Sequence, residues 1–165
     1  MKNILISSLC LLSLNCFANI TGTYDIKRGF AETHSISQLE QLGKYRLVMK
    51  DANRNKLKIK GIMRGKFDPS TQTSSHTLVN TERTGTLITA EDFFTNIYAG
   101  DPVCANGVVP FEVEERLNIV SGTGIYAGVQ PGSYIIVQGA INNCPCYDNF
   151  LQNDFSVTGG VITFN

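Results

Sequence analysis

The sharpest chemical feature of the sequence is a glutamate, Glu115, in the middle of an apolar alternation. In "VVPFEVEERLNIVSG" every second residue shares one face of an extended strand. A carboxylate on an apolar face must be hydrogen-bonded, paired or protonated, and a raised pKa there marks a candidate acid. The alternatives are a bulge that turns Glu115 outward, or an ion pair with Arg83 or Arg116. The face of Glu115 comprises Val109, Phe111, Val113, Glu115, Leu117 and Ile119.

A histidine and two aromatic residues are the candidates to act beside Glu115. His76 alternates with Leu78, Asn80 and Glu82, so it could point inward, although a surface position or a satisfied core position is the alternative. We expect Phe111, Glu115 and Tyr134 to contact a ligand, with Glu115, His76 and Tyr134 as the candidates for catalysis. No zinc-binding or serine-hydrolase motif occurs, so no metal and no cofactor is predicted.

Three cysteines, Cys104, Cys144 and Cys146, follow residue 18. We predict a disulfide of Cys104 with Cys144 or Cys146, which closes a loop of about 40 residues and contributes roughly 4 kcal/mol. The odd cysteine would stay free or link two chains into a dimer. The alternatives are no bridge at all, or a redox or metal site at Cys144 and Cys146, although the one intervening proline is unlike the usual two-residue spacing.

The glycines of "SGTGIYAGVQPGSYIIVQGAIN" indicate a turn between strands. Gly122, Gly124 and Gly128 are spaced one residue too widely for a dinucleotide fingerprint, and a strand follows where a helix would be needed. Glycine supplies positive φ and tight bends at such a turn.

The first residues resemble a secretory signal peptide. Lys2 precedes an apolar run from Ile4 to Leu14, and the small residues Cys16 and Ala18 stand at positions −3 and −1 of a cleavage site after Ala18. We expect residues 1–18 to be removed, leaving a single domain, residues 19–165, that is secreted or periplasmic, with a bacterial type of signal. The run is too short for a spanning helix, so no stable membrane insertion is expected; lipid attachment at Cys16 is the other alternative.

The charge balance gives no support for a nucleic-acid partner. The chain has 14 basic and 14 acidic residues, so loss of Lys2 leaves 13 against 14. Nucleic-acid binding requires a concentrated basic surface. The lysines of "KLKIKGIMRGKF" alternate with apolar residues, which is typical of the solvent face of a strand.

Eight or nine short segments with strand patterning are separated by turn residues. "KYRLVMK", "DANRN" and "KLKIKGIMRGKF" form a strand, a turn and a strand, and further strands follow to "FSVTGGVITFN". Glycines within strands favour a barrel over a sandwich. "AETHSISQLEQLG" could form a helical turn or a loop, and Ala90 to Gly107 is expected to be a long loop pinned by Cys104. The predicted fold is an all-β, single antiparallel barrel of about eight strands.

The glycine-rich stretch resembles the hairpin of allene oxide cyclase-like and dirigent-like barrels. In that family G-G-T-G-x-[FY]-x-G-A-x-G precedes a strand, and Gly122-Thr123-Gly124 and Tyr126-Ala127-Gly128 match it, while Ser121 and Val129 depart from it. "ERTGTLITAEDFF" resembles the preceding strand and turn. The resemblance implies an eight-stranded antiparallel barrel, often around an apolar cavity, and assigns no catalytic residue.

Three functions fit these observations. The first is non-catalytic binding of an apolar small molecule in the barrel or at its mouth. The second is a secreted interaction or assembly protein that acts through its outer surface. The third is an enzyme of cyclase or isomerase type with Glu115 in the cavity.

Overall fold

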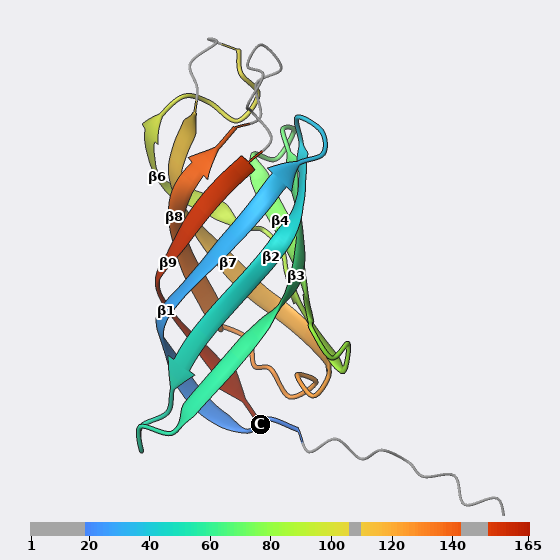
Figure 1. Cartoon of the computed structure of the whole chain (residues 1–165), viewed down its shortest axis with the longest axis vertical. Coiled ribbons are helices and arrows are strands. Elements are labelled where there is room, and N and C mark those ends of the chain that lie inside the picture. Colours follow the sequence, from blue (N-terminus) through green and yellow to red (C-terminus); the bar gives the residue numbers. More distant parts are fainter. Residues whose placement is uncertain (1–18, 106–109, 143–151) are drawn as a thin grey trace, which may run out of the picture.

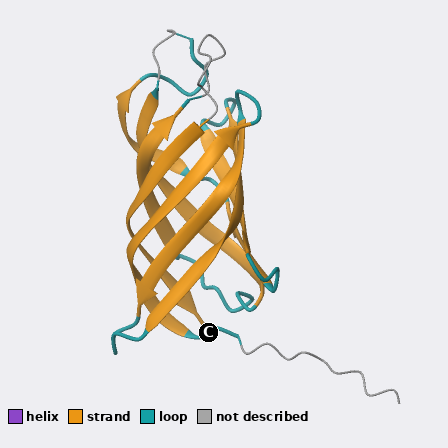
Figure 2. Ribbon diagram, viewed as in Figure 1, coloured by secondary structure: helices purple, strands orange, loops and turns teal. Residues whose placement is uncertain are grey.

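The chain folds into a closed, all-β barrel (Figures 1 and 2). The computed structural model describes residues 19–105, 110–142 and 152–165. Within these residues no helix is long and apolar enough to span a bilayer. The strands are β1 (Gly22–Ser35), β2 (Glu40–Lys50), β3 (Lys56–Asp68), β4 (Thr73–Asn80), β5 (Gly85–Thr89), β6 (Phe93–Ala99), β7 (Phe111–Gly124), β8 (Tyr134–Ile141) and β9 (Gln152–Phe164).

The barrel is an antiparallel meander that two additional pairings close. Strands β1 to β5 pair in sequence order, as do β6 to β9. The first strand pairs with the last along their length, from Gly22 opposite Phe164 to His34 opposite Gln152. β5 pairs with the end of β7, and β6 pairs with its beginning, so β6 is an extra strand beside an eight-stranded barrel. The predicted barrel is therefore confirmed.

Apolar residues that alternate along each strand fill the interior. On β7 the inward face runs from Phe111 to Ile119, and Glu115 lies on it with 2% of its surface exposed. This confirms the predicted alternation and excludes a bulge that turns Glu115 outward. The core consists of Ile26, Ala31, Tyr45, Leu47, Met49, Ile59, Met63, Leu78, Leu87, Leu117, Ile119, Tyr126, Ile135, Val137, Phe155, Val157, Ile162 and Phe164.

The glycine-rich stretch forms the turn between β7 and β8, as its spacing predicts. Gly124 has a φ of 58°, a left-handed conformation that favours glycine. A Cβ atom on Gly124 would lie 1.8 Å from the carbonyl oxygen of Thr84, so a side chain cannot be accommodated there. The hairpin thus packs against the start of β5, where the barrel closes.

A short break between β5 and β6 brings a new side chain into the barrel. The expected loop from Ala90 to Gly107 is wrong in part, because Phe93–Ala99 forms β6. Glu91 adopts a φ of 52°, and Asp92 forms an isolated bridge with Ser74 of β4, with N–O distances of 2.9 and 3.0 Å. This bridge fixes the backbone of Asp92 beside β4, where its side chain is fully buried.

One further prediction is resolved by the structure, and two fall on residues that it does not describe. The segment around Ile36 is a turn between β1 and β2, not a helix. Residues 1–18, and Cys144 and Cys146, lie outside the described residues, so the signal peptide and the disulfide stay predictions. Cys104 lies in the turn region after β6 with a φ of 56°.

Candidate active site

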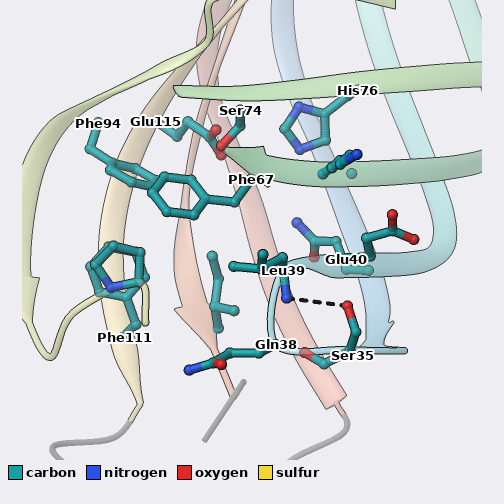
Figure 3. A pocket seen from close by; sticks show the side chains of 16 residues that line it. Ser35, Gln38, Leu39, Glu40, Phe67, Ser74, His76, Phe94, Phe111 and Glu115 are labelled. Carbon is teal, nitrogen blue, oxygen red and sulfur yellow. Dashed lines mark hydrogen bonds between the residues drawn. The ribbon is translucent and has the colours of Figure 1, made fainter. Parts of the chain in front are cut away.

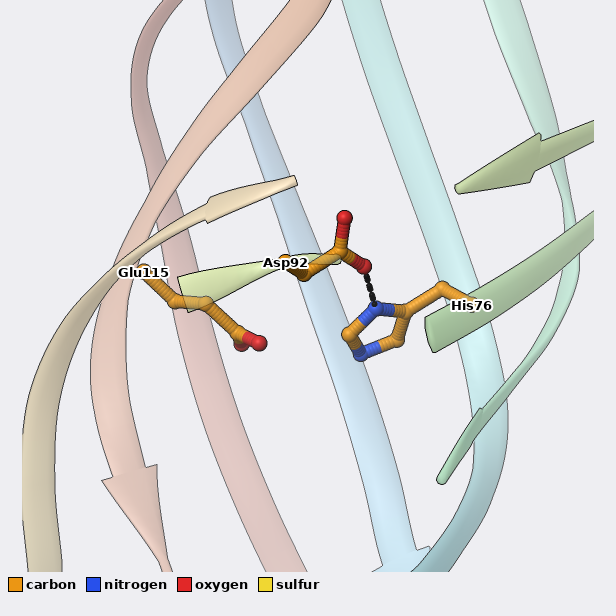
Figure 4. Close-up of side chains that lie close together, drawn as sticks. All are labelled: His76, Asp92 and Glu115. Carbon is orange, nitrogen blue, oxygen red and sulfur yellow. Dashed lines mark hydrogen bonds and ion pairs between the residues drawn. The ribbon is translucent and has the colours of Figure 1, made fainter. Parts of the chain in front are cut away.

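Three ionisable side chains from three different elements meet inside the barrel (Figure 4). His76 comes from β4, Glu115 from β7 and Asp92 from the break between β5 and β6. Their exposed fractions are 3%, 2% and 0%. Nitrogen or oxygen atoms of the three, one from each, lie within 4.8 Å of one another. Sequence alternation indicated His76 and Glu115, and the structure brings them together.

Asp92 is held by hydrogen bonds at both carboxylate oxygens. Its Oδ1 accepts a hydrogen bond from the backbone N–H of Asn118 at 2.6 Å. Its Oδ2 accepts from the hydroxyl of Thr89 and lies 2.8 Å from Nδ1 of His76. A carboxylate has no proton to give, so Nδ1 of His76 must carry the hydrogen. Asp92 therefore fixes both the tautomer and the ring orientation of His76.

Thr89 completes this arrangement by linking the backbone of His76 to Asp92. Its hydroxyl oxygen accepts a hydrogen bond from the backbone N–H of His76 at 2.8 Å, and its single hydrogen is donated to Asp92. Every member of the group is buried. The hydrogen bonds to Thr89, to both oxygens of Asp92 and to Nδ1 of His76 are buried or partly buried, so they hold the imidazole in one position.

The second ring nitrogen of His76 and the carboxyl group of Glu115 face each other. With Nδ1 bound to Asp92, the Nε2 atom turns towards Glu115 (Figure 4). Oε1 of Glu115 is one of two buried side-chain polar atoms without a hydrogen-bond partner among the described residues; the hydroxyl of Tyr45 is the other. A buried polar atom left without a partner is costly, so this oxygen is available to a ligand or a water molecule.

Glycine at position 65 provides the space for the imidazole ring. Gly65 on β3 lies opposite His76 in the register of the two strands. A Cβ atom there would approach Cδ2 and Nε2 of His76 to 2.8 Å. That distance is shorter than real Cβ contacts, so any other residue would displace the ring.

The cluster lies between two pockets. The outer pocket opens at the end of the barrel that carries the β1–β2 turn, and has phenylalanine walls from Phe67, Phe94 and Phe111 (Figure 3). The ring centroids of Phe67 and Phe94 are 5.8 Å apart, and those of Phe94 and Phe111 are 5.0 Å apart. The inner pocket is apolar and lies deeper in the barrel. His76 and Glu115 line both pockets, together with Gln41.

The enclosed space in these pockets is small. It measures about 40 Å³ in the outer pocket and about 20 Å³ in the inner one. A cavity needs about 10–15 Å³ on this measure to hold one water molecule. The two pockets therefore have room for a few water molecules, or for the reactive end of a molecule that enters from the open side.

The surroundings shift the protonation of both His76 and Glu115. Burial raises the pKa of Glu115, and the charge of Asp92 adds to this, against the opposing charge of His76. Burial alone would lower the pKa of His76, but the hydrogen bond to Asp92 and the charges of Glu115 and Asp92 raise it overall. An imidazolium paired with Asp92, beside a neutral Glu115, gives the buried cluster no net charge. A cluster without net charge costs less to bury than one that carries an unpaired charge.

The same three residues are the described group that could hold a metal ion. A cation would have to compete for Asp92 with three hydrogen-bond donors, one of them the N–H of His76. Ligation through Nε2 of His76 and Glu115 would avoid that competition but uses only two protein ligands. The arrangement thus favours proton chemistry over metal binding.

Of the two aromatic residues predicted to contact a ligand, one lies in the outer pocket and the other lies outside both pockets. Phe111 lines the outer pocket together with Glu115. Tyr134 lines neither pocket; its ring lies under the guanidinium of Arg116, with 3.8 Å from Cζ to the ring centroid. Arg116 also donates to Asn118 at 3.0 Å, so the alternative ion pair between Arg116 and Glu115 is not formed. The sequence did not indicate Asp92, because it lies at the break where alternation ends. Thr89 is the inward-facing last residue of β5, and its uncharged side chain did not mark it as a candidate.

Comparison with known proteins finds no relative of this chain. The chain matches no family model, no curated protein and no solved structure. The fold and the geometry of the site are therefore what bear on its function.

Proposed function

We propose that the protein is a small-molecule acid–base catalyst of the cyclase or isomerase type, with Glu115 as the proton donor. His76, held by Asp92, is the second donor. The observation that carries the proposal is the pair of buried polar atoms, Nε2 of His76 and Oε1 of Glu115, that face each other between two pockets. The proposal includes export of the chain, as its first residues predict.

The chemistry follows from the two donors. A neutral carboxylic acid and an imidazolium that converge on one point can stabilise negative charge developing on a substrate oxygen. A carboxyl group whose pKa is raised towards neutrality is also well suited to transfer its proton. Asp92 would not itself exchange a proton with the substrate, because its oxygens are already engaged. Its role would be to orient His76 and keep it charged.

The walls of the outer pocket suggest the class of substrate. Phe67, Phe94 and Phe111 would pack against an apolar body, while the two donors require an oxygen at the leading end. A carbonyl or an epoxide oxygen meets this requirement, since each reacts more readily when its oxygen accepts a proton. Because the enclosed space is small, the apolar body would remain near the mouth of the barrel.

Non-catalytic binding of an apolar small molecule is the second candidate. It is favoured by the contact among the three phenylalanine rings of the outer pocket. Under this alternative Glu115 and His76 would hold the oxygen of the ligand without transferring a proton to it. Both candidates use the same pocket, so one experiment can distinguish them.

The experiment follows a small epoxide, cyclohexene oxide, and a small ketone, cyclohexanone, in the presence of the exported protein. Nuclear magnetic resonance reports binding through the ring signals of His76. It reports turnover through conversion of the epoxide to its isomer 2-cyclohexen-1-ol, or through deuterium uptake by the ketone in heavy water. In the isomerisation Glu115 protonates the epoxide oxygen and the C–O bond breaks, and the carboxylate left on Glu115 then takes a proton from the neighbouring carbon as the C=C bond forms. In the exchange Glu115 protonates the carbonyl oxygen, and its carboxylate takes the proton from the α-carbon.

The variants Glu115→Gln and Glu112→Gln make the comparison. Gln at position 115 keeps the shape of the side chain but cannot donate a proton, so turnover should fall at least about 100-fold while binding persists. Glu112 lies on the same strand with its side chain exposed, so Glu112→Gln should behave like the natural protein. Binding without turnover by the natural protein would favour the second candidate. Neither binding nor turnover across a panel of such compounds would overturn both.

A further inference from the structure

We propose that one side of the barrel docks on an anionic lipid surface. This inference is independent of the site inside the barrel. The surface, here called the basic face, lies on the outside of β1, β2 and β3 and consists of Arg28, Arg46, Lys50, Lys56, Lys58 and Lys60. It holds six of the 14 lysines and arginines of a chain whose net charge is zero.

The strand register places these cations beside one another. Arg46 lies opposite Lys60, and Lys50 lies opposite Lys56. Successive outward residues on β3 are about 6.6 Å apart, and adjacent strands are separated by about 4.8 Å. Like charges directly opposite each other in a sheet are destabilising, so folding alone gives no reason for this arrangement.

The cations of the basic face form no salt bridges among the described residues, although Glu82 lines one hollow together with Arg46, Lys58 and Lys60. Asp25 lies opposite Lys50 in the register, but its carboxylate is bonded to Lys27 at 3.1 Å. The charge of Lys58 is the largest of several that lower the pKa of Lys56. An anionic surface would relieve this repulsion.

Apolar side chains accompany the charges on the same side of the barrel. Phe30 lies opposite Arg46 and is 38% exposed, and Ile62 follows Lys60 on β3 and is 55% exposed. A shallow, open groove of about 310 Å³ is lined by Arg28, Gly29, Phe30, Arg46 and Val48. Two guanidinium groups beside an apolar lining suit a phosphate headgroup and the start of its acyl chains.

The mixture of cations and exposed apolar residues favours lipid over nucleic acid. Nucleic-acid surfaces combine cations with aromatic rings on which bases stack. Beside the basic face lie one exposed ring, that of Phe30, and the aliphatic side chain of Ile62, which would gain by leaving water at a bilayer interface. A barrel lying on its side would contact the membrane along β2 and β3, which run beside each other in Figure 1.

Sedimentation with vesicles tests the proposal. Vesicles of phosphatidylcholine mixed one to one with phosphatidylglycerol should bind the protein, whereas vesicles of phosphatidylcholine alone should not. Binding should weaken as salt is added, because the interaction is screened beyond about 10 Å at 0.1 M ionic strength. Each lysine at an anionic surface contributes a factor of about five, so Lys58→Gln should weaken binding about fivefold. The double variant Lys58→Gln/Lys60→Gln should weaken it about 25-fold.

Two matched controls separate the basic face from the rest of the molecule. Arg83→Gln removes one exposed positive charge from the β4–β5 turn and should leave binding unchanged. Ile62→Ser should weaken binding, whereas Val120→Ser, at a position 56% exposed on β7, should not. Equal binding to both kinds of vesicle, or equal effects of Lys58→Gln and Arg83→Gln, would overturn the proposal. Tighter binding to a single-stranded oligonucleotide, unaffected by Ile62→Ser, would overturn it in favour of a nucleic-acid partner.

Discussion

Nδ1 of His76 and Oδ2 of Asp92 lie 2.8 Å apart in the interior of the barrel, although the residues are separated by 16 positions in the chain. The break between β5 and β6 makes this possible, because it allows Asp92 to bridge to Ser74 while its side chain turns inward. Four further consequences of the interior can be measured.

Loss of the carboxylate of Asp92 should destabilise the protein. In Asp92→Asn the side-chain amide has only one acceptor oxygen, so it cannot accept hydrogen bonds from His76, Thr89 and the backbone N–H of Asn118 as the carboxylate does. Breaking a buried ion pair in this way typically costs about 3–5 kcal/mol of the free energy of unfolding. The pKa of His76, followed by nuclear magnetic resonance, should fall because the supporting charge is gone. Asp154→Asn, at an exposed site on β9, should change the free energy of unfolding by less than about 0.5 kcal/mol. Equal losses in the two variants would contradict a supporting role for Asp92.

Stability should decline as pH rises from acid to neutral values. The pKa of Glu115 is raised above 4.5, so between 4.5 and its folded value the folded state holds a proton that the unfolded state has lost. The raised pKa of His76 acts in the same sense above 6.5. Each proton held only by the folded state gives a slope of up to about 1.4 kcal/mol per pH unit.

Urea unfolding across this pH range measures both slopes. Glu115→Gln should flatten the decline that begins near pH 4.5, and its stability relative to the natural protein should improve as pH rises. Glu112→Gln is the control, since its side chain is exposed. A natural protein whose stability increases with pH through this range would contradict the protonated state assigned to Glu115.

The size of residue 65 should control the position of His76. Gly65→Ala places a methyl group 2.8 Å from the imidazole, and overpacking of this kind costs about 1–3 kcal/mol. The ring signals of His76 should shift, and any turnover should be lost with them. At Gly159 the nearest atom to an added Cβ is 4.0 Å away, so Gly159→Ala should be tolerated. Unchanged His76 signals in Gly65→Ala would show that the imidazole ring does not pack tightly against the backbone of residue 65.

Two buried tyrosines should respond differently to removal of their hydroxyl groups. The hydroxyl of Tyr45 is buried without a partner, so Tyr45→Phe should be neutral or stabilising. Burial raises the pKa of the Tyr126 hydroxyl to about 12, while a hydrogen-bonding contact with the side chain of Asn80 lowers it. Tyr126→Phe should therefore cost about 1 kcal/mol. Thermal unfolding of the two variants gives the comparison, and a larger loss for Tyr45→Phe would indicate a partner for its hydroxyl.

The barrel could be predicted from the sequence because alternation and turn residues are local signals. The strand containing Glu115 shows this well, since one inward face from Phe111 to Ile119 follows from a period of two. The strand β6 was missed because most of its residues are exposed, so it has no buried face to produce alternation. Its pairing with β7 contains two register shifts, which weaken the pattern further.

The site could be predicted only in part, for a related reason. Glu115 and His76 lie in regular strands, where every second side chain points to the same side of the sheet, so their inward direction follows from their positions in the sequence. Asp92 stands at a break, and its inward direction depends on the positive φ of Glu91 and the bridge to Ser74. Tyr134 was expected at the ligand, but it packs against Arg116 instead. Side-chain partners of this kind depend on register between distant strands, which one sequence does not display.

The pairing of β1 with β9 has a consequence for the folding of the protein during its synthesis. Gly22 meets Phe164, so the seam of the barrel joins residues at opposite ends of the described chain. The seam cannot form on the ribosome or at an export pore until the last strand has emerged. Until then both edges of the growing sheet are open to other chains. Such distant contacts also slow folding, so the protein should depend on holding chaperones during its synthesis.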